Sequence, residues 1–438
     1  MKVLKFGGTS VGSAQRMKEV TTLIADGSRK LVVLSAMSGT TNALVEISDY
    51  LYKKNTESAN EVINMLEKKY AATIDELYSK PEYKTKAAEA IKTVFDHIRA
   101  FTGKDDFTCA EEKIILAQGE MMSTAMVCFY MNEQGIKAVL LPALEFMRTD
   151  KNGEPDSAYI QEHIAPQLAK HKDAEILITQ GYICRNFKGE IDNLQRGGSD
   201  YTATLIGAAI KAEEIEIWTD IDGIHNNDPR FVEGTKPIAN LHFKEAAELA
   251  YFGAKILHPT CVLPAKLTGT PIRLLNTMEP KAKGTLISDY CTPNKIEAVA
   301  AKDGITVIKI TSTRMLLAYG FLRKVFEVFE KYQTPIDMIT TSEVGISMTI
   351  DNDKFLPEII DELREYGNIK YEKDMVIVCV VGDLTHENVG FQAKVVAALG
   401  KIPIRMISYG GSNCNISFLV KSEDKKRALN ALSDNLFK

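Results

Sequence analysis

The sequence predicts an α/β protein: a mostly parallel sheet flanked by helices, followed by two smaller α+β units. Two observations support this prediction. Over the first 290 residues, short apolar segments alternate with longer amphipathic ones, which is typical of a buried parallel sheet with helices between its strands. The last third of the chain contains an internal repeat with a period of about 70 residues. The length of 438 residues suits roughly three domains of ~150 residues each.

Six short apolar segments are expected to form the sheet: Lys2–Phe6, Leu31–Ser35, Ala138–Leu141, Glu175–Thr179, Glu214–Trp218 and Pro271–Leu275. The clearest amphipathic stretches between them predict helices at Thr108–Asn132, Tyr201–Ala212 and Phe243–Ala250. Residues 55–103 are rich in Lys and Glu and poor in strand formers. We interpret them as a helical insertion at the rim of the sheet.

The repeat in the last third follows the order strand, helix, strand, strand, helix. Val307–Ile310 is matched by Ile377–Val380, and Gly320-Phe321 returns as Gly390-Phe391. The polar segment Ser288–Ile296 separates the repeats from the sheet-forming part. We therefore expect a domain over residues 1–290, one repeat unit over 297–374 and a second over 375–438, with strands shared between the two units.

The composition excludes several classes of protein. Lys and Arg number 53 against 58 Asp and Glu, so the basic excess typical of nucleic-acid binders is missing. No run of ~18 or more apolar residues predicts a membrane-spanning helix, and the amino terminus lacks a signal-peptide pattern. The seven cysteines have neither zinc-site nor disulfide-framework spacing. We expect a cytoplasmic protein with reduced thiols and assign no metal to its side chains.

A polar cluster ends the first predicted strand. Its residues are Lys5-Phe6-Gly7-Gly8-Thr9-Ser10, and the two glycines allow the backbone to approach an anion closely. Their amides and the start of the next helix form a candidate phosphate cradle, beside which Lys5 places a positive charge. A glycine turn with a solvated lysine is the alternative, and the local sequence favours neither interpretation.

Two further clusters favour a ligand site. Arg196–Asp200 precedes a predicted helix that Ser199 or Asp200 could cap, and its arginine suits a carboxylate or a phosphate. Trp218–Gly223 and Asn226–Arg230 carry acidic side chains after another strand. Ligands bind at the carboxyl ends of strands in open α/β sheets. Three such clusters therefore predict a ligand-binding edge.

Common nucleotide-binding fingerprints are missing from the sequence. The chain has no GxG triplet, which excludes the dinucleotide fingerprint and the glycine loop of protein kinases. Gly7 and Gly12 have the GxxxxG spacing of a Walker A loop, but Ser13-Ala14 follow in place of its Lys-Ser/Thr. A nucleotide would have to be bound by another arrangement.

The clusters, taken together, resemble the aspartate kinases of the amino acid kinase superfamily. The segments that carry the resemblance are Lys5–Ser10, Leu34–Ala36, Thr41-Asn42, Gly119-Glu120, Arg196–Asp200, Thr219-Asp220, Asp228–Arg230 and Gly253–Pro259. The resemblance implies the amino acid kinase fold, a three-layer structure with a mostly parallel sheet flanked by helices, followed by two ferredoxin-like ACT domains. It also implies transfer of the ATP γ-phosphoryl group to the side chain of L-aspartate, with Mg²⁺ and no tightly bound cofactor.

The resemblance further implies roles for individual residues. The catalytic group would be Lys5, Arg196 and Asp200. The phosphates would be bound by Gly7, Gly8, Thr9 and Ser199. Aspartate would be bound by Ser35, Thr41, Glu120 and Arg196. The nucleotide would be bound by Thr219, Asp220, His225, Asp228, Arg230 and Lys255. Because the acceptor carboxylate has a pKa near ~3.9, it needs no general base, and catalysis must come from positioning and charge neutralisation.

The repeated units resemble amino-acid-sensing ACT domains, and the first resembles those of lysine-sensitive, single-function aspartate kinases. The implied lysine site consists of Met315, Ala318, Ile336, Asp337, Ser342 and Glu343. Its acidic pair suits a basic effector, so we expect lysine rather than threonine. Ala318 departs from the hydroxyl residue common at its position. We also expect a homodimer through the ACT domains, or a tetramer, and neither nucleic acid nor membrane as a partner.

Two alternative functions stay open from the sequence. The chain could be another amino acid kinase, acting on glutamate or acetylglutamate, or a catalytically silent regulator that binds amino acids. The aspartate-binding group favours free aspartate over the other acceptors, and Lys5, Arg196 and Asp200 argue against a silent protein. Trp218 lies on a predicted buried strand, so we interpret it as a core residue.

Overall fold

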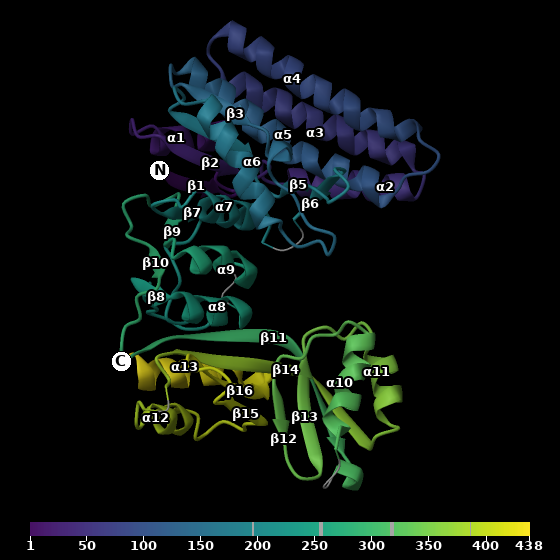
Figure 1. Ribbon diagram of the computed structural model, residues 1–438, viewed down its shortest axis with the longest axis vertical. Helices are drawn as coiled ribbons and strands as arrows, with labels where there is room; N and C mark the ends of the chain where they lie inside the picture. The colour runs from purple at the N-terminus through teal and green to yellow at the C-terminus, as the bar shows by residue number, and fades with distance from the viewer. Residues whose placement is uncertain (195–196, 254–256, 316–318, 386) are drawn as a thin grey trace. The chain divides into compact units, whose positions relative to one another are not determined.

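The computed structural model describes residues 1–194, 197–253, 257–315, 319–385 and 387–438. The chain forms two compact units, one of residues 1–223 and 257–289, the other of residues 224–256 and 290–438 (Figure 1). The second unit thus takes a segment from within the predicted sheet domain. The domain boundaries that the sequence suggests, 1–290, 297–374 and 375–438, stay predictions.

The first unit is built on a mostly parallel sheet, as predicted. Its strands lie in the order β3-β4-β2-β1-β7-β9-β10, and neighbours pair in parallel except for β9 and β10, which are antiparallel. The bounds are β1 Lys2–Phe6, β2 Lys30–Leu34, β3 Ala138–Leu141, β4 Ile176–Gln180, β7 Ile215–Thr219, β9 Ile272–Asn276 and β10 Thr285–Ser288. The six predicted strands are therefore present, each within one residue of its expected position.

Helices surround this sheet, and a small hairpin follows β4. The helices are α1 Ala14–Ile24, α2 Thr40–Tyr52, α3 Thr56–Leu77, α4 Pro81–Ala100, α5 Cys109–Glu133, α6 Ser157–Lys170, α7 Gly198–Ala209 and α9 Pro259–Thr268. The hairpin consists of β5 Ile183–Arg185 and β6 Ile191–Asn193. Helices α3 and α4 occupy the segment interpreted as an insertion, and α3 packs on α2 while α4 packs on α5 (Figure 1).

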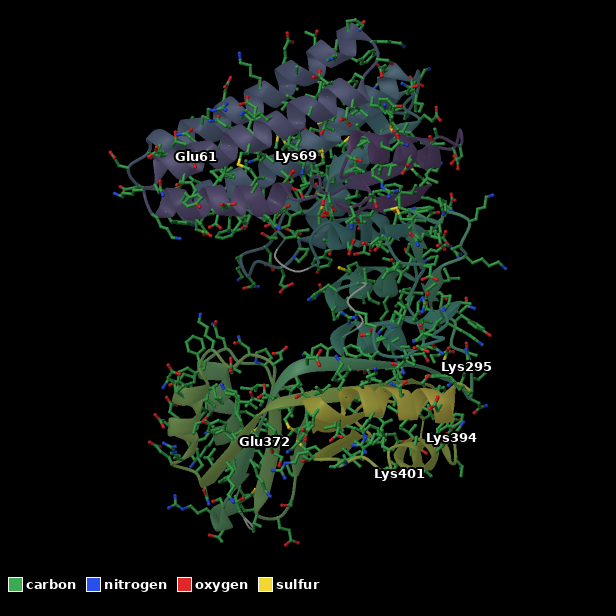
Figure 2. The ribbon with its side chains drawn as sticks, turned by 180° about the vertical axis from the view of Figure 1, so that it is seen from behind. Glu61, Lys69, Lys295, Glu372, Lys394 and Lys401 are labelled. Carbon is green, nitrogen blue, oxygen red and sulfur yellow. The ribbon has the colours of Figure 1, made fainter. Side chains whose placement is uncertain are left out.

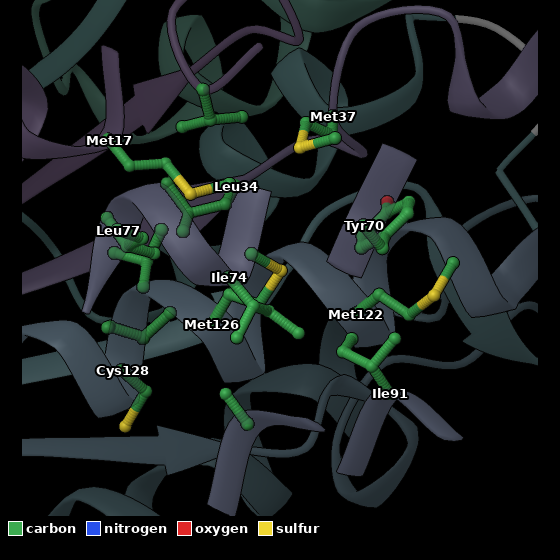
Figure 3. Close-up of a cluster of buried hydrophobic side chains, with 14 of the residues drawn as sticks. Met17, Leu34, Met37, Tyr70, Ile74, Leu77, Ile91, Met122, Met126 and Cys128 are labelled. Atoms are coloured by element: carbon green, nitrogen blue, oxygen red, sulfur yellow. The ribbon is translucent and has the colours of Figure 1, made fainter. Parts of the chain in front are cut away.

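Methionines and aliphatic residues of α1 to α5 fill a core against the sheet. Met17, Leu34, Ile74 and Met126 are among its buried members (Figure 3). Helix α5 is long and apolar enough to cross a membrane by length and composition, but 72% of its most apolar stretch is buried inside the protein. Burial of this kind is the pattern of a core helix.

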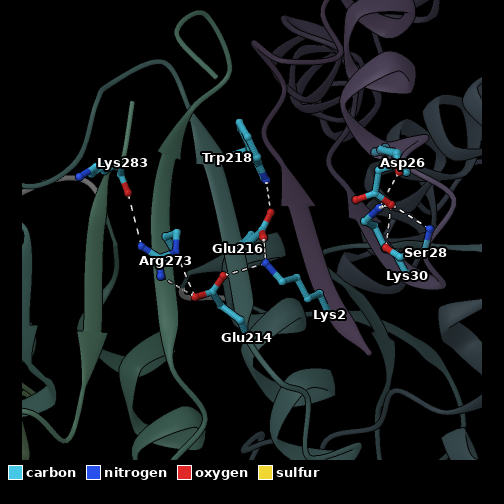
Figure 4. A network of polar contacts seen from close by, with 10 residues as sticks. Lys2, Asp26, Ser28, Lys30, Glu214, Glu216, Trp218, Arg273 and Lys283 are labelled. Carbon is cyan, nitrogen blue, oxygen red and sulfur yellow. Dashed lines mark hydrogen bonds and ion pairs between the residues drawn. The ribbon is translucent and has the colours of Figure 1, made fainter. Parts of the chain in front are cut away.

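A polar network joins the strands at their amino-terminal ends. Lys2 Nζ lies 3.1 Å from Glu214 Oε1 and 2.7 Å from Glu216 Oε1, and Arg273 reaches the other oxygen of Glu214 (Figure 4). Trp218 donates from Nε1 to Glu216 Oε2 at 2.9 Å. The indole is buried and stacks on Phe6 with 5.7 Å between ring centroids. Trp218 is therefore a core residue, as the sequence analysis expected.

The second unit contains an antiparallel sheet in the order β12-β13-β11-β14-β16-β15. The strands of this sheet are β11 Ile296–Thr311, β12 Ile339–Thr341, β13 Gly345–Ile350, β14 Asn368–Gly382, β15 Met406–Tyr409 and β16 Asn415–Lys421. The short strand β8 Asn240–His242 belongs to the same unit but not to this sheet. Its helices are α8 Phe243–Tyr251, α10 Phe321–Lys331, α11 Leu356–Leu363, α12 Phe391–Ala398 and α13 Lys425–Leu436. Each repeat thus follows the order strand, helix, strand, strand, helix.

The two repeats share their longest strands. Val299, in the first half of β11, belongs to the core that contains Val380 and Phe418 of the second repeat. Ile308, in the second half of β11, belongs to the core of the first repeat, against which Ile369 of β14 packs. Each repeat therefore completes its core with strand residues that lie in the sequence of the other.

This sharing predicts how core substitutions combine. Val299 pairs directly with Val380 across β11 and β14, so Val299→Ala and Val380→Ala are expected to be non-additive by about 0.5 kcal/mol or more. Val299→Ala and Ile359→Ala affect different cores and are expected to add within about 0.5 kcal/mol. Denaturant unfolding of the single and double variants measures both terms. Additivity of the first pair would contradict a shared core.

Candidate active site

Polar residues gather where the parallel strands end. The chain turns at Gly7 after β1, at Ser35 after β2, at Gly181 after β4 and at Asp220 after β7. Because these strands run in parallel and are neighbours in the sheet, their carboxyl ends form one edge. The sequence-predicted clusters of the first unit therefore share the edge at which α/β sheets bind ligands.

Close packing requires glycine in the turn after β1. A Cβ on Gly8 would lie 2.9 Å from the Ala36 carbonyl oxygen, and a Cβ on Gly7 would lie 3.3 Å from Lys5 Nζ. The amide of Ser10 donates to the Gly7 carbonyl at 3.0 Å, and its buried hydroxyl bonds Thr277 Oγ1 at 2.8 Å. Ser10 thus has internal hydrogen-bond partners for both its amide and its hydroxyl.

Two predicted catalytic residues meet at this edge. Lys5 Nζ, on β1, lies 2.7 Å from Asp200 Oδ1, and both side chains are largely buried. Asp200 is in the first turn of α7, so the ion pair joins the glycine turn to the start of that helix. When a phosphate binds, the contact between the ammonium group and the carboxylate can be replaced by contacts of the ammonium group with the phosphate and of the carboxylate with its counter-ion.

The start of α7 differs from the sequence expectation. Its capping residue is Gly197, in the left-handed conformation with φ of 74°, and Ser199 and Asp200 lie within the first turn. A side chain on Gly197 would come within 2.3 Å of Cys261 Sγ, so the tight contact with α9 leaves room only for glycine. Ser199 is buried against Gly181, where a Cβ would lie 2.3 Å from the Ser199 Cβ.

Glu120 is the buried acid of the site. It lies on α5, only 4% exposed, and its Oε1 accepts from the Ala36 amide at 3.1 Å. Its Oε2 is buried and has no hydrogen-bond partner in the described ranges. Burial raises the pKa of Glu120 to about 7, although the bond from Ala36 lowers it. An unpartnered buried carboxylate oxygen can accept hydrogen bonds from an ammonium group of a ligand.

Two further residues predicted to bind the acceptor, Ser35 and Thr41, lie between β2 and the first turn of α2. Ser35 follows β2, and its carbonyl oxygen accepts from Ser123 Oγ at 2.8 Å. Thr41 is exposed in the first turn of α2, next to Thr40, whose hydroxyl bonds that of Tyr70 at 3.0 Å. Ser35 and Thr41 thus lie on either side of Ala36, whose amide binds Glu120.

Tyr182 is a residue of this edge that sequence reasoning missed. Its φ of 67° is left-handed, a strained conformation for a tyrosine that is enriched at functional sites. The ring lies beside Gly198, and Asn193 Nδ2 donates to the hydroxyl at 3.0 Å. Its position directly after Gly181, at the end of a buried strand, was the available signal.

The nucleotide group is described in two parts, because its members fall in different units. In the first unit, Thr219 Oγ1 donates to Asp220 Oδ1 at 3.1 Å. In the second, His225 Nδ1 lies 2.9 Å from Thr235 Oγ1. Two further members, Asp228 and Arg230, form an ion pair at 2.7 Å. Burial opposes ionisation of Asp228, but hydrogen bonds from Arg230 hold its pKa below the usual value.

Three predicted site residues lie outside the described residues. They are Arg196, Lys255 and Ala318. The roles assigned to them stay predictions.

The described residues of the predicted effector group lie in the first repeat of the second unit. Met315 and Ile336 pack on the core of the first repeat, while Ser342 and Glu343 are exposed in the turn between β12 and β13. Among described residues, no recorded hydrogen bond or ion pair joins Asp337 to Ser342 or Glu343. The effector site therefore stays a prediction at the level of its geometry.

Asp337 has partners that the sequence did not indicate. Its Oδ1 accepts from Tyr251 on α8 at 2.5 Å and lies 2.7 Å from Lys302 Nζ. Lys302 also contacts Asp351 at 2.8 Å, and its ammonium lies 4.2 Å from the centre of the Tyr251 ring. Burial alone would lower the pKa of Lys302, but these two carboxylates raise it. An internal ammonium group thus holds Asp337.

Comparison with known proteins gives matches to two family profiles and to full-length relatives. The amino acid kinase family profile matches residues 1–276, and the ACT domain profile matches residues 378–436. The lysine-sensitive aspartokinase 3 of Escherichia coli (strain K12) is 33% identical to this chain over 99% of each sequence.

Solved structures agree with this assignment. E. coli aspartokinase III in complex with aspartate and ADP, in its R-state, matches 100% of both chains with a TM-score of 0.84 at 32% identity. The complex of E. coli aspartokinase III with lysine and aspartate, in its T-state, matches with a TM-score of 0.82 at 33% identity, again over 100% of both chains. The amino acid kinase fold with ACT domains, expected from the sequence, is therefore confirmed.

The raised pKa of Glu120 predicts a pH-dependent stability difference between Glu120→Gln and the parent. A carboxyl group whose pKa rises on folding favours the folded state at low pH, and this advantage is lost as the pH rises from about 4.5 to about 7. Gln does not titrate, so the free energy of unfolding of the variant, relative to that of the parent, should rise by on the order of 3 kcal/mol across this range.

Denaturant unfolding between pH 5 and 8 measures this difference. Glu89→Gln, at an exposed position of α4, is the matched control and should show a constant difference from the parent. A constant difference for Glu120→Gln as well would mean that the Glu120 carboxylate is stabilised by a partner.

Proposed function

Because this chain belongs to the aspartokinases of the amino acid kinase family, we propose that it transfers the γ-phosphoryl group of ATP to the side-chain carboxylate of L-aspartate. The product is 4-aspartyl phosphate, and the reaction is the first step of lysine, threonine and methionine biosynthesis. The observation that supports this best is Glu120 Oε2, a buried acceptor without a partner in the described ranges. It suits the α-ammonium group of an amino acid better than any group of ATP.

The chemistry needs positioning rather than proton transfer. The acceptor carboxylate is ionised at neutral pH, so the protein must bring an anion to a polyanion and neutralise the charge that develops. Lys5 supplies the positive charge next to the transferring group, and Gly7, Gly8 and Thr9 present backbone amides to the phosphates. Asp200 holds Lys5 in place, while Ser199 borders the path of the phosphoryl group.

The substrate aspartate is oriented by its three charged groups. Glu120 receives the ammonium group, Arg196 binds the α-carboxylate, and Ser35 and Thr41 contact the remainder. In this arrangement the side-chain carboxylate points toward Lys5 and the glycine turn. Orientation of this kind replaces a bimolecular encounter with a step inside one complex, which contributes several kcal/mol to catalysis.

ATP brings Mg²⁺ with it. In the part of the chain that the structure describes, no group of three or more His, Cys, Asp and Glu side chains is arranged to hold a metal ion. Mg²⁺ bound with ATP would take ligands from the phosphates, and it would neutralise charge on the transferring group. Thr219, Asp220, His225, Asp228, Arg230 and Lys255 form the nucleotide-binding group. The enzyme acts in the cytoplasm as a homodimer or tetramer assembled through its ACT domains.

Lysine inhibits the enzyme by feedback. The support for this effector is the set of acidic and hydroxyl residues in the first repeat, including Asp337, Ser342 and Glu343, together with the lysine-sensitive relative from E. coli. A carboxylate pair discriminates a basic amino acid from threonine by charge.

Acceptor specificity is the direct test of the proposed reaction. With ATP and Mg²⁺, the parent is expected to phosphorylate aspartate and to leave glutamate and acetylglutamate unmodified in a coupled assay for ADP release. Lys5→Ala should lower kcat by about 100-fold or more, because it removes the charge beside the transferring group. Turnover of glutamate or acetylglutamate in place of aspartate would indicate a different amino acid kinase, and no turnover of any acceptor would indicate a silent regulator.

The effector assignment is tested separately. Lysine is expected to inhibit the parent more strongly than threonine. Glu343→Ala should relieve this inhibition by about ten-fold or more in the lysine concentration required, because it removes one charged contact. Activity without lysine should not change, since Glu343 lies in an exposed turn. Equal lysine sensitivity of Glu343→Ala and the parent would contradict the site.

A further inference from the structure

The helical insertion brings a lysine to the wall of the candidate active site. Lys69 lies on α3 (Figure 2). Its Nζ donates to the Ser38 carbonyl oxygen, and a Cβ on Gly39 would lie 3.6 Å from this nitrogen. No carboxylate of the described residues forms an ion pair with Lys69. The ammonium group is therefore held on the backbone between β2 and α2 rather than in a surface ion pair.

The peptide that Lys69 holds adjoins the phosphate turn. A Cβ on Gly8 would lie 3.8 Å from both the amide nitrogen and the Cα of Ser38, and a Cβ on Gly12 would lie 3.0 Å from the Ser38 side chain. Ser38 lies two residues after Ala36, whose amide donates to Glu120. Movement of this peptide would therefore displace both the turn after β1 and the donor to Glu120.

Two neighbouring residues of α3 contact this segment in different ways. Tyr70 is fully buried and bonds the Thr40 hydroxyl at 3.0 Å, so it anchors α3 on α2 through packing. The side chain of Lys69 is exposed, and its ammonium group contacts the segment at the Ser38 carbonyl. Burial of that group lowers the pKa of Lys69. Since Tyr70 already anchors the helix, the charge of Lys69 is not needed for this purpose.

We propose that Lys69 is a positioning residue for catalysis. By holding the Ser38 carbonyl, it fixes the segment from Ser35 to Thr41, which contacts both Glu120 and the glycine turn after β1. The helical insertion then contributes to the active site and is not only a peripheral addition to the sheet. This inference rests on the proposed function, because its readout is aspartate turnover.

The segment serves the acceptor more than the nucleotide. Ser35, Thr41 and the Ala36 amide on Glu120 belong to the aspartate side, whereas the nucleotide group begins with Thr219 and Asp220 at the end of β7 and continues in the second unit. Loss of the Lys69 contact should therefore raise KM for aspartate and lower kcat, with little change in KM for ATP. A general loss of stability would not separate the two substrates in this way.

Steady-state kinetics of Lys69→Met, Lys69→Arg and Lys68→Met test the proposal. Lys69→Met should lose about ten-fold or more in kcat/KM for aspartate, because a charged donor is removed, and less than about three-fold in kcat/KM for ATP. Lys69→Arg keeps a charged donor and should recover most of the loss. Lys68→Met, at the exposed neighbouring position, is the matched control and should behave like the parent.

Thermal unfolding of the same variants completes the test. A Lys69→Met protein with the parent's melting temperature and a selective loss for aspartate supports the proposal. Kinetics equal to those of Lys68→Met, or equal losses for both substrates with a lowered melting temperature and no rescue by Lys69→Arg, overturn it. A parent that does not phosphorylate aspartate contradicts the proposed function instead, so the two failures are distinguishable.

Discussion

The arrangement of the site depends on the peptide group of Ala36, which lies between two loops. Its carbonyl oxygen lies so close to Gly8 that no Cβ fits there, and its amide binds Glu120. Gly119 is constrained by the same residue, because a Cβ there would lie 2.8 Å from the Ala36 Cβ. Parallel pairing of β1 and β2 sets this distance. Replacement of either glycine would push the glycine turn and the buried acid apart.

The charged groups of this edge have different kinds of partner. Lys5 is paired with Asp200, while Glu120 accepts from a backbone amide and forms no ion pair with a cation among the residues that the structure describes. Burial of a carboxylate without a cationic partner is energetically unfavourable. The same feature makes the site selective, because a ligand with an ammonium group removes that cost and a ligand without one does not.

Much of this edge could be predicted from the sequence because its signals are local. Apolar runs located the strands, and the known geometry of parallel sheets then placed Lys5, Ser35 and Thr219 on one edge without further information. The missed features are long-range. The bond between Ser10 and Thr277 spans 267 positions, and no local pattern marks either hydroxyl as a partner.

The glycines illustrate the same limit. Gly197 and Gly181 are needed because Cys261 and Ser199 occupy the space that a side chain would take, and neither neighbour could be identified from spacing. The sequence placed the helix cap at Ser199 or Asp200 because hydroxyl and carboxylate groups are the usual caps. Packing against α9 prevailed over that preference.

The shared strands give the proposed feedback a physical basis within the second unit. Lys302 lies where β11 changes its register against β14, between the half that fills the second core and the half that fills the first. Its ammonium group holds Asp337, which also binds Tyr251 of α8. A basic effector that engages Asp337 would compete with both partners. It would therefore alter the junction of the two repeats and the contact with α8 in one event, and α8 belongs to the same compact unit as Asp228 and Arg230 of the nucleotide group.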